Sequence, residues 1–377
     1  MAQRILLVNP QGGVNTDLPN MGLAYAATHY NSKVIDFNTK PLPHERLFEE
    51  QADILGISVR SFALSDAKKI AGEYKKKFPN AQVKSVSGFL DVQCCYPFLN
   101  FKETLSYDEN FSDNYPFPNF EFFDSFDEFK KNWESGKWAF PVMTSKGCPF
   151  QCTYCTARNR KWFPRSAQNC VEELRRAKEK WKIKKFQVLD DCFNLDNKRV
   201  LDFCEKVAPL ELEWYCTNGV RADRFNKQQA LAMSKSGCDH VGFGIESVDP
   251  NVLQKIRKGE SFEQIEKAVD IANKHFWSVT GFFIIGLPGS SFDGDMAAVN
   301  FCNEKGIAGN FSFYVPFDKQ VQSDKKFYGD GSQPVSDAYS LEEQQRVYDE
   351  ARKKNLFKIF NLMARRIRVK ASRVFKN

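Results

Sequence analysis

Histidine is scarce in this 377-residue chain, which contains four. None of these residues (His29, His44, His240 and His275) lies in a C-x-x-H or H-x-x-H pair. Structural zinc sites usually recruit Cys and His from two short-spaced pairs. The scarcity of histidine therefore disfavours a zinc-binding module.

Long hydrophobic runs are also missing. No apolar stretch approaches the length of a membrane span, and the first residues, MAQRILLVNP, lack the extended apolar segment of a signal peptide. A hydrophobic fraction of 42% is ordinary for a globular protein. We therefore expect a cytoplasmic protein with two domains or one elaborated barrel.

A disulfide framework is the third absence. Eight of the 11 cysteines are scattered through apparent strands and helices without a regular spacing: Cys94, Cys95, Cys170, Cys192, Cys204, Cys216, Cys238 and Cys302. Such scatter suits a reducing compartment, with each thiol acting as a small buried hydrophobe.

The other three cysteines, Cys148, Cys152 and Cys155, form a CxxxCxxC array in KGCPFQCTYCTA, residues 146–157. An apolar, strand-like run leads into this loop, and an aromatic residue, Tyr154, directly precedes the third cysteine. Three thiolates can hold three irons of a cluster. A zinc site and purely structural cysteines are the alternative interpretations of this array.

This stretch resembles the radical S-adenosylmethionine (SAM) superfamily, whose motif is CxxxCx(aromatic)C on a loop after the first barrel strand. Iron-sulfur cubanes normally take four thiolates, so a three-cysteine loop leaves one iron without a protein ligand. In the family, that iron of a [4Fe-4S] cluster chelates SAM. An electron passed into the sulfonium then yields a 5'-deoxyadenosyl radical.

Alternating strand and helix patterns follow the cysteine loop. Strands are predicted at 140–146, 184–190, 211–217, 239–246, 278–285 and 309–315, with helix starts at Asp196 and Pro250 and a helix end before Gly237. The pattern predicts an α/β fold, a partial (β/α)6 TIM barrel over residues 139–318. Reactive groups should lie at the carboxyl ends of its strands.

Several polar and small residues occupy these predicted strand ends: Asp190, Asp191, Asn218, Arg221, Glu246, Ile284 and Gly286. The resemblance implies that they bind SAM: Glu246 the ribose hydroxyls and Arg221 the methionine carboxylate. Tyr154 and Ile284 would supply apolar walls for the adenine.

Each assignment has a structural alternative. Asp190 or Asp191 could cap the next helix, Glu246 could form a structural ion pair, and Gly286 could belong to a simple turn. Their common position on one rim favours the functional interpretation.

Residues 1–100 alternate strands and helices in a way that predicts a Rossmann-like parallel sheet. Phrases such as LLVNP, MGLAYAA and DILGISVR resemble the cobalamin-binding domain that precedes many radical SAM enzymes. The base-off motif Asp-x-His-x-x-Gly is absent, and a helix, strand and helix are missing after Gly88. We therefore expect a shortened domain with weak or absent cobalamin binding, or a vestigial domain that packs on the barrel.

Two further segments complete the chain. Residues 101–138 form an aromatic linker that either wraps the domains or covers a substrate. Residues 319–377 form a helical extension, and ten Lys or Arg but no acidic residue lie between Ala351 and Asn377. This basic amphipathic tail could close the barrel or contact an anionic membrane surface peripherally. No recognition fold accompanies the charge, so no nucleic acid partner is expected.

The sequence thus predicts a radical SAM enzyme that abstracts hydrogen from an unactivated carbon of a small-molecule or lipid-like substrate. Oxidation, cyclisation or rearrangement of the substrate radical is the expected outcome, with a reductant such as flavodoxin or ferredoxin. A cobalamin-dependent radical C-methyltransferase is the alternative, and a non-catalytic iron-sulfur or zinc protein is the second alternative.

Overall fold

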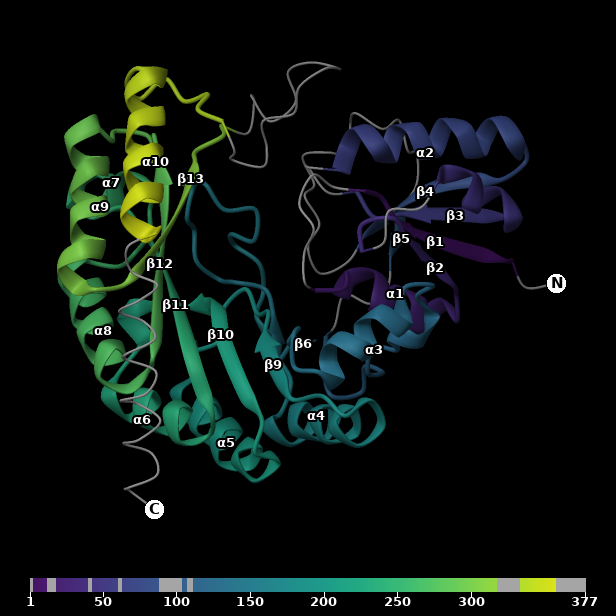
Figure 1. The fold of residues 1–377 in the computed structure, drawn as a ribbon, viewed down its shortest axis with the longest axis horizontal. Coiled ribbons are helices and arrows are strands. Elements are labelled where there is room, and N and C mark those ends of the chain that lie inside the picture. Colours follow the sequence, from purple (N-terminus) through teal and green to yellow (C-terminus); the bar gives the residue numbers. More distant parts are fainter. Residues whose placement is uncertain are drawn as a thin grey trace. The chain divides into compact units, whose positions relative to one another are not determined.

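The structure is a computed structural model that describes residues 3–11, 18–39, 43–59, 63–87, 104–106, 111–316 and 333–356. The chain divides into two compact units (Figure 1). The first comprises Met1–Pro141, Glu179–Ile183 and Phe317–Asp330, and the second comprises Val142–Lys178, Lys184–Pro316 and Gly331–Asn377. The predicted linker at 101–138 thus falls within the first unit.

The first unit is built on a five-stranded parallel sheet in the order β2-β1-β3-β4-β5. Its strands are β1 (Ile5–Asn9), β2 (Val34–Asp36), β3 (Ile54–Ile57), β4 (Gln82–Ser87) and β5 (Thr104–Ser106). Its helices are α1 (Met21–Tyr30), η1 (His44–Glu49), α2 (Leu64–Lys77), η4 (Phe120–Phe122) and α3 (Phe126–Glu134). The near-continuous apolar runs of β1 and β3 are typical of strands buried on both faces.

Strand β5 gives this sheet the 2-1-3-4-5 order of flavodoxin-like folds. The sequence predicts a domain over residues 1–100 that lacks a helix, strand and helix after Gly88. Gly88, Cys94 and Cys95 lie outside the described residues. A fifth strand nevertheless pairs with β4, with Leu105 opposite Val86. In such sheets, ligands bind where the strand order reverses, outside the carboxyl ends of β1 and β3.

A buried polar network occupies that switch point. The Asn9 amide donates to Asp36 Oδ1 at 2.7 Å, and the Asn20 amide donates to Asn9 Oδ1 at 3.1 Å and to Ser58 Oγ at 2.8 Å. Asn9, Asn20 and Asp36 are at most 4% exposed. Asn9 and Ser58 therefore lie at the strand ends, as the sequence predicts.

Aromatic residues from the predicted linker pack inside the first unit. The rings of Phe120, Trp133, Phe140 and Trp181 lie 5.1 to 5.9 Å apart in the contacting pairs, mostly edge to face. Phe120, Trp133 and Phe140 have no exposed surface. Burial of each ring contributes roughly 1.5–3 kcal/mol, so this cluster anchors residues 111–138.

The second unit contains a six-stranded sheet in the order β13-β12-β11-β10-β9-β6. Its strands are β6 (Phe140–Val142), β9 (Lys185–Val188), β10 (Glu213–Val220), β11 (Cys238–Glu246), β12 (Ser278–Ile285) and β13 (Ala308–Phe313), and a hairpin of β7 (Ser145–Lys146) and β8 (Phe163–Pro164) follows β6. Among the described strands, β6 and β13 form the two edges of the sheet. The sheet is therefore an open, partial barrel, as predicted.

Helices follow the strands and lie along the outer face of this sheet (Figure 1). They are α4 (Ala167–Trp181), α5 (Asn197–Val207), α6 (Lys227–Lys235), α7 (Pro250–Lys255), α8 (Phe262–His275), α9 (Phe292–Lys305) and α10 (Leu341–Leu356), with short turns η5 (Ala208–Leu210) and η6 (Ala222–Arg224). The predicted boundaries are confirmed: Asp196 caps α5, Pro250 begins α7, and Gly237 has a positive φ after α6.

Strand alternation separates the two faces of β12. Phe283 stacks on Phe311 at 4.7 Å, and a Cβ on Gly281 would meet both Phe283 and Ile245, so these residues share one face. Because neighbouring residues of a strand point to opposite faces, Phe282 and Ile284 point to the other face. A Cβ on Gly242 would meet the ring of Phe282, which places Gly242 there as well.

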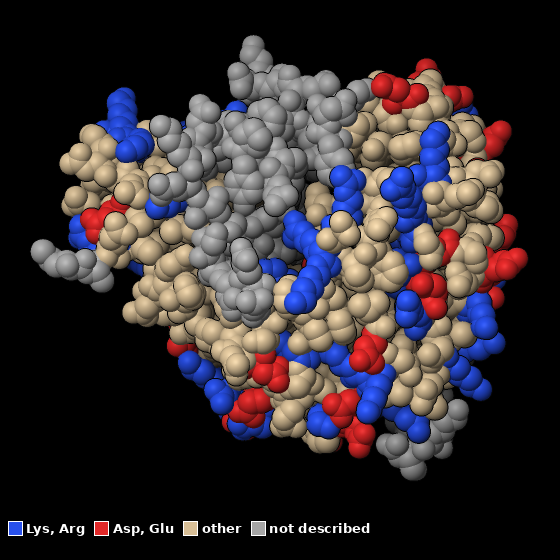
Figure 2. Space-filling view, turned by 180° about the vertical axis from the view of Figure 1, so that it is seen from behind, with Lys and Arg blue, Asp and Glu red and all other residues tan. Residues whose placement is uncertain are grey.

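The C-terminal helix α10 belongs to the second unit. It packs against α9 and β13, with Val347 and Ala351 buried and Tyr348 5.0 Å from the ring of Phe313. The apolar stripe predicted beyond Leu356 lies outside the described residues. Within the described part of the chain, no helix has the length and apolar character needed to cross a membrane. On the face drawn in Figure 2, acidic and basic side chains are interspersed.

Candidate active site

The cysteine loop projects from the β7/β8 hairpin. Gly147 has a φ of +87°, and a Cβ there would lie 2.1 Å from the Lys161 carbonyl oxygen, so only glycine fits this turn. The Arg160 amide donates to the Cys148 carbonyl at 2.9 Å, and the Asn159 amide donates to the Phe150 carbonyl at 2.7 Å. Backbone hydrogen bonds within the loop therefore hold its conformation.

The three thiols share one electrostatic environment. Burial, with a smaller contribution from the neighbouring Cys148 and Cys152, raises the pKa of Cys155 to about 11. Burial also raises the pKa of Cys152, while Lys258 and Arg221 oppose the rise. The cysteine loop thus lies beside two cations, and a metal that binds the sulfurs as thiolates would offset the cost of burying their negative charges.

This donor set fits a three-thiolate cluster. Among the described residues, no three His, Cys, Asp or Glu side chains come close enough to hold a single metal ion. A zinc site needs four such donors around one ion. Three cysteines on one loop supply the number and kind of donors that an iron-sulfur cubane with one open iron takes.

A fourth cysteine lies beside the loop. The Cys192 thiol makes a hydrogen bond with Cys148, which is the leading cause of a Cys148 pKa lowered to about 7. Cys192 is fully buried, and its carbonyl accepts from Trp162 Nε1 at 3.0 Å. The sequence predicts only a buried small hydrophobe at this position, because scattered cysteines carry no spacing signal.

Arg221 clamps the loop from the end of β10. Its guanidinium carbon lies 3.5 Å from the centre of the Phe150 ring, a close cation-π contact. It also pairs with Asp223 at 2.9 Å and donates to the carbonyls of Lys258 and Gly259 at 3.3 Å. Arg221 therefore joins the cysteine loop to the turn after α7.

That turn supplies a buried cation that the sequence analysis missed. Lys258 is 6% exposed, and its Nζ lies 3.3 Å from Glu246 Oε1, 3.4 Å from Glu260 Oε2 and 3.5 Å from the Tyr154 hydroxyl. Burial lowers the pKa of Lys258, but the carboxylates of Glu246 and Glu260 outweigh it, so the pKa lies above its usual value. Lys258 stays protonated.

Glu246 has an unusual backbone. Its φ is +68°, which lies in the left-handed region. This conformation costs a residue with a Cβ about 1–3 kcal/mol and persists only where the surrounding structure imposes it. Its carboxylate folds back over Gly244, where a Cβ would lie 2.5 Å from Oε1. Such strain in a buried carboxylate beside Tyr154 and Lys258 is typical of a functional site.

The two aspartates after β9 hold the start of the cysteine loop. Asp190 is 1% exposed and accepts hydrogen bonds from Thr144 N, Thr144 Oγ1 and Ser145 Oγ, each at 2.6 Å. Asp191 Oδ2 accepts from Gly147 N at 2.9 Å. Neither aspartate caps the next helix, since Asp196 fills that position.

The other predicted site residues lie along the same strand ends. Asn218 is exposed near the end of β10. Glu246 pairs in register with Phe283, so Ile284 lies on the strand next to Glu246. Gly286, with φ +76°, follows β12 and donates its amide hydrogen to Asp295 Oδ2 at 2.9 Å. The predicted rim is therefore assembled, although Ile284 and Gly286 make no recorded contact with the cysteine loop within the described residues.

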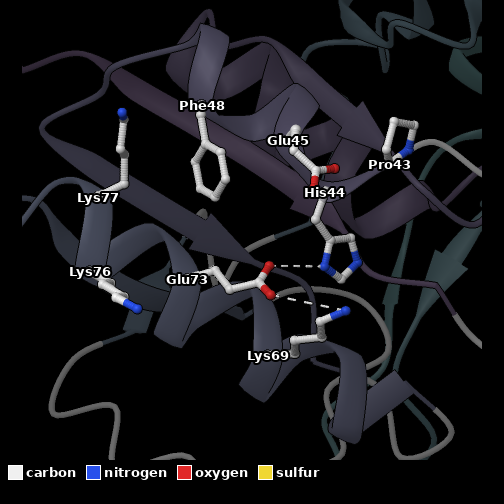
Figure 3. Close-up of a pocket in the computed structure, with 8 residues that line it drawn as sticks. All are labelled: Pro43, His44, Glu45, Phe48, Lys69, Glu73, Lys76 and Lys77. Atoms are coloured by element: carbon white, nitrogen blue, oxygen red, sulfur yellow. Dashed lines mark hydrogen bonds and ion pairs between the residues drawn. The ribbon is translucent and has the colours of Figure 1, made fainter.

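A separate surface pocket of about 700 Å³ lies in the first unit between η1 and α2 (Figure 3). His44 Nδ1 lies 3.1 Å from Glu73, and its Nε2 lies 3.0 Å from Asp66. Figure 3 shows His44 and Lys69 both directed at the Glu73 carboxylate. Glu73 thus pairs with both His44 and Lys69, and the pocket shares no residue with the cysteine loop.

Residues 142–302 match the family model of the Radical SAM superfamily. Residues 142–302 are a radical SAM domain. An uncharacterized methyltransferase of Pyrococcus horikoshii is 34% identical over 180 residues, which cover 47% of this chain and 39% of the relative. Cytidylyl-2-hydroxyethylphosphonate methyltransferase of Streptomyces wedmorensis is 28% identical over 218 residues, covering 54% and 41%. The chain therefore matches about two fifths of the length of these relatives.

Solved structures share the fold of this radical SAM chain. The methyltransferase TsrM from Kitasatospora setae, with cobalamin and a [4Fe-4S] cluster bound, gives a TM-score of 0.66 at 15% identity and covers 83% of this chain and 72% of its own. The cobalamin-dependent enzyme OxsB, with aqua-cobalamin and SAM bound, gives 0.61 at 17% identity, covering 93% and 55%. Membership in the superfamily implies a [4Fe-4S] cluster and SAM as cofactors.

Proposed function

We propose that this radical SAM protein is a cobalamin-dependent C-methyltransferase. The observation that carries the proposal is the complete 2-1-3-4-5 parallel sheet of the first unit, in the same chain as the radical SAM domain. Relatives named as methyltransferases support it. They favour the alternative drawn from the sequence over its main expectation of oxidation, cyclisation or rearrangement.

The expectation of weak cobalamin binding rested on a missing helix, strand and helix after Gly88 and on the absent base-off motif, and β5 supplies the strand. The first unit contains His29 in α1 and His44 in η1, and His44 is held by Asp66 and Glu73. The switch point instead presents Asn9, Asn20 and Ser58. We therefore propose that cobalamin binds there without an imidazole ligand from this unit.

In the second unit, Cys148, Cys152 and Cys155 would hold the cluster. The cluster and cobalamin would supply one-electron chemistry and methyl carriage when bound. Lys258 would pair with the methionine carboxylate of SAM, because it is a buried cation next to Glu246 and Tyr154. Arg221 was predicted for this role, but its guanidinium already donates hydrogen bonds to Asp223 and to the backbone of the α7–α8 turn.

The proposed reaction also needs an acceptor and an electron donor. The acceptor is an unactivated carbon of a small-molecule or lipid-like substrate, which acid-base side chains cannot deprotonate at neutral pH. Flavodoxin or ferredoxin would supply electrons. The basic tail could bring the enzyme to an anionic membrane surface, where a lipid-like substrate would reside.

Cobalamin binding tests the proposal. After anaerobic reconstitution with iron, sulfide and hydroxocobalamin, then desalting, we expect about one cobalt and about four irons per chain. Ser58→Tyr, which fills the switch point, should abolish cobalt retention and preserve iron. Gln51→Tyr places the same ring at an exposed position before β3 and serves as the control.

Two results would contradict the methyltransferase assignment. One is a wild-type protein that holds iron but no cobalt. The other is a cobalamin-loaded enzyme that forms 5'-deoxyadenosine from SAM but never a methylated product with any accepted substrate. Either result would restore hydrogen abstraction without methyl transfer as the leading function.

The Glu246→Gln substitution tests SAM binding separately. It keeps the shape of the side chain but removes the charged acceptor, and charge-assisted hydrogen bonds are worth roughly 1.5–3 kcal/mol. SAM affinity, measured by calorimetry on reconstituted protein, should fall about tenfold or more while iron content stays constant. Unchanged affinity would exclude Glu246 as the ribose ligand.

A further inference from the structure

The turn after β12 is held by residues from distant parts of the chain. A Cβ on Gly286 would lie 2.7 Å from Gln344 Oε1 and 3.0 Å from Ser336 Cβ. Its φ of +76° also disfavours any other residue. The C-terminal segment therefore sits directly against Gly286, and no room remains for a side chain between them.

Both backbone polar groups of Gly286 are bound by this arrangement. The amide donates to Asp295 Oδ2 at 2.9 Å, and the carbonyl accepts from Ser336 Oγ at 2.5 Å. The Tyr339 hydroxyl donates to the same Asp295 oxygen at 2.6 Å. Asp295 lies in the first turn of α9 and is 4% exposed.

Gln344, in the first turn of α10, holds the segment from Ser336 to Tyr339 by hydrogen bonds. It has no exposed surface, and its amide nitrogen donates to the Ser336 carbonyl at 2.9 Å and the Tyr339 carbonyl at 2.8 Å. The Gln344 side chain therefore fixes the backbone of Ser336 and Tyr339, whose hydroxyls donate to Gly286 and Asp295. Deleting it would leave two buried carbonyls unpaired, and such losses are costly.

We propose that Asp295 and Gln344 are positioning residues for SAM. They act indirectly, by fixing the backbone of the turn at Gly286. The inference rests on the proposed function. Glu246 pairs in register with Phe283, so Ile284 and Gly286 begin the rim next to the ribose site. A network that fixes both polar groups of Gly286 fixes that rim. Helix α10, which looks like a terminal appendage, is therefore part of the SAM site.

The test compares SAM affinity with thermal stability in reconstituted full-length protein. Asp295→Ala and Gln344→Ala should each weaken SAM binding at least about fivefold by calorimetry while the iron content stays at the wild-type level. Asp295→Asn keeps an acceptor for Gly286 and Tyr339 and should restore affinity to within about twofold of wild type. Val347→Ala, buried on α10 about one helical turn after Gln344, is the matched control.

The control separates positioning from general destabilisation. Val347→Ala should lower the melting temperature with less than a twofold change in affinity. If it weakens SAM binding as much as Gln344→Ala at a similar melting temperature, or if Asp295→Ala binds SAM normally, the positioning role is wrong. A wild-type protein with iron that fails to bind SAM would overturn both this role and the proposed function, whereas normal wild-type binding with unaffected variants overturns this role alone.

Discussion

Replacing Cys148, Cys152 and Cys155 together with alanine is expected to remove essentially all iron, the brown absorbance and 5'-deoxyadenosine formation. We expect the three thiolates to hold three irons and the fourth iron to have no protein ligand. Iron analysis and the visible spectrum after anaerobic reconstitution measure the effect.

A matched triple variant controls for the loss of thiols. Cys170, Cys204 and Cys302 are buried in α4, α5 and α9, and alanine at all three should lower stability but preserve iron. The fold of the ligand-free loop variant should also persist, because Asp190 and Asp191 hold the loop's entry through backbone and hydroxyl hydrogen bonds. A full cluster in the loop variant would show that other residues are the ligands.

The cysteine loop and the barrel could be predicted from the sequence because their signals are local. Ligand spacing in the loop lies within eight residues, from Cys148 to Cys155, and the barrel strands alternate with amphipathic helices. Glu246 and Ile284 fall at strand ends by the same alternation. Because β11 and β12 are paired neighbours in the sheet, the ends of these two strands lie side by side.

Tertiary contacts explain what the sequence could not reveal. Lys258 lies in a turn between α7 and α8 rather than at a strand end, so only the fold brings it to Glu246. Arg221 was predicted as a ligand because of its place after β10, yet Asp223 and the Phe150 ring engage it. Strand β5 lies in FKETLSY, the one strand-like stretch of the predicted linker, and only the fold shows that it pairs with β4 to extend the sheet.

Substituting Lys258 with methionine is expected to have the second large effect. The change leaves the buried carboxylate of Glu246 without its cation, and removing one partner of a buried pair typically costs roughly 3–5 kcal/mol. Glu260 keeps Arg221, whose Nε lies 3.6 Å away, and accepts from the backbone amides of Ala222 at 2.8 Å and Asp223 at 3.5 Å, so Glu246 carries most of this loss. Chemical denaturation should report this loss of stability, and Lys267→Met, at an exposed site on α8, should change stability little.

SAM affinity then separates a ligand role for Lys258 from a structural one. Adding Glu260→Gln to Lys258→Met removes a buried carboxylate that has lost one of its two cations, Arg221 being the other. It should recover part of the lost stability, because an amide tolerates burial better than a charge. The methionine carboxylate would still lack its cation, so affinity should stay about tenfold or more below wild type. If the double variant regains both stability and SAM affinity, Lys258 serves only to neutralise its neighbours, and Arg221 becomes the remaining buried cation for the carboxylate.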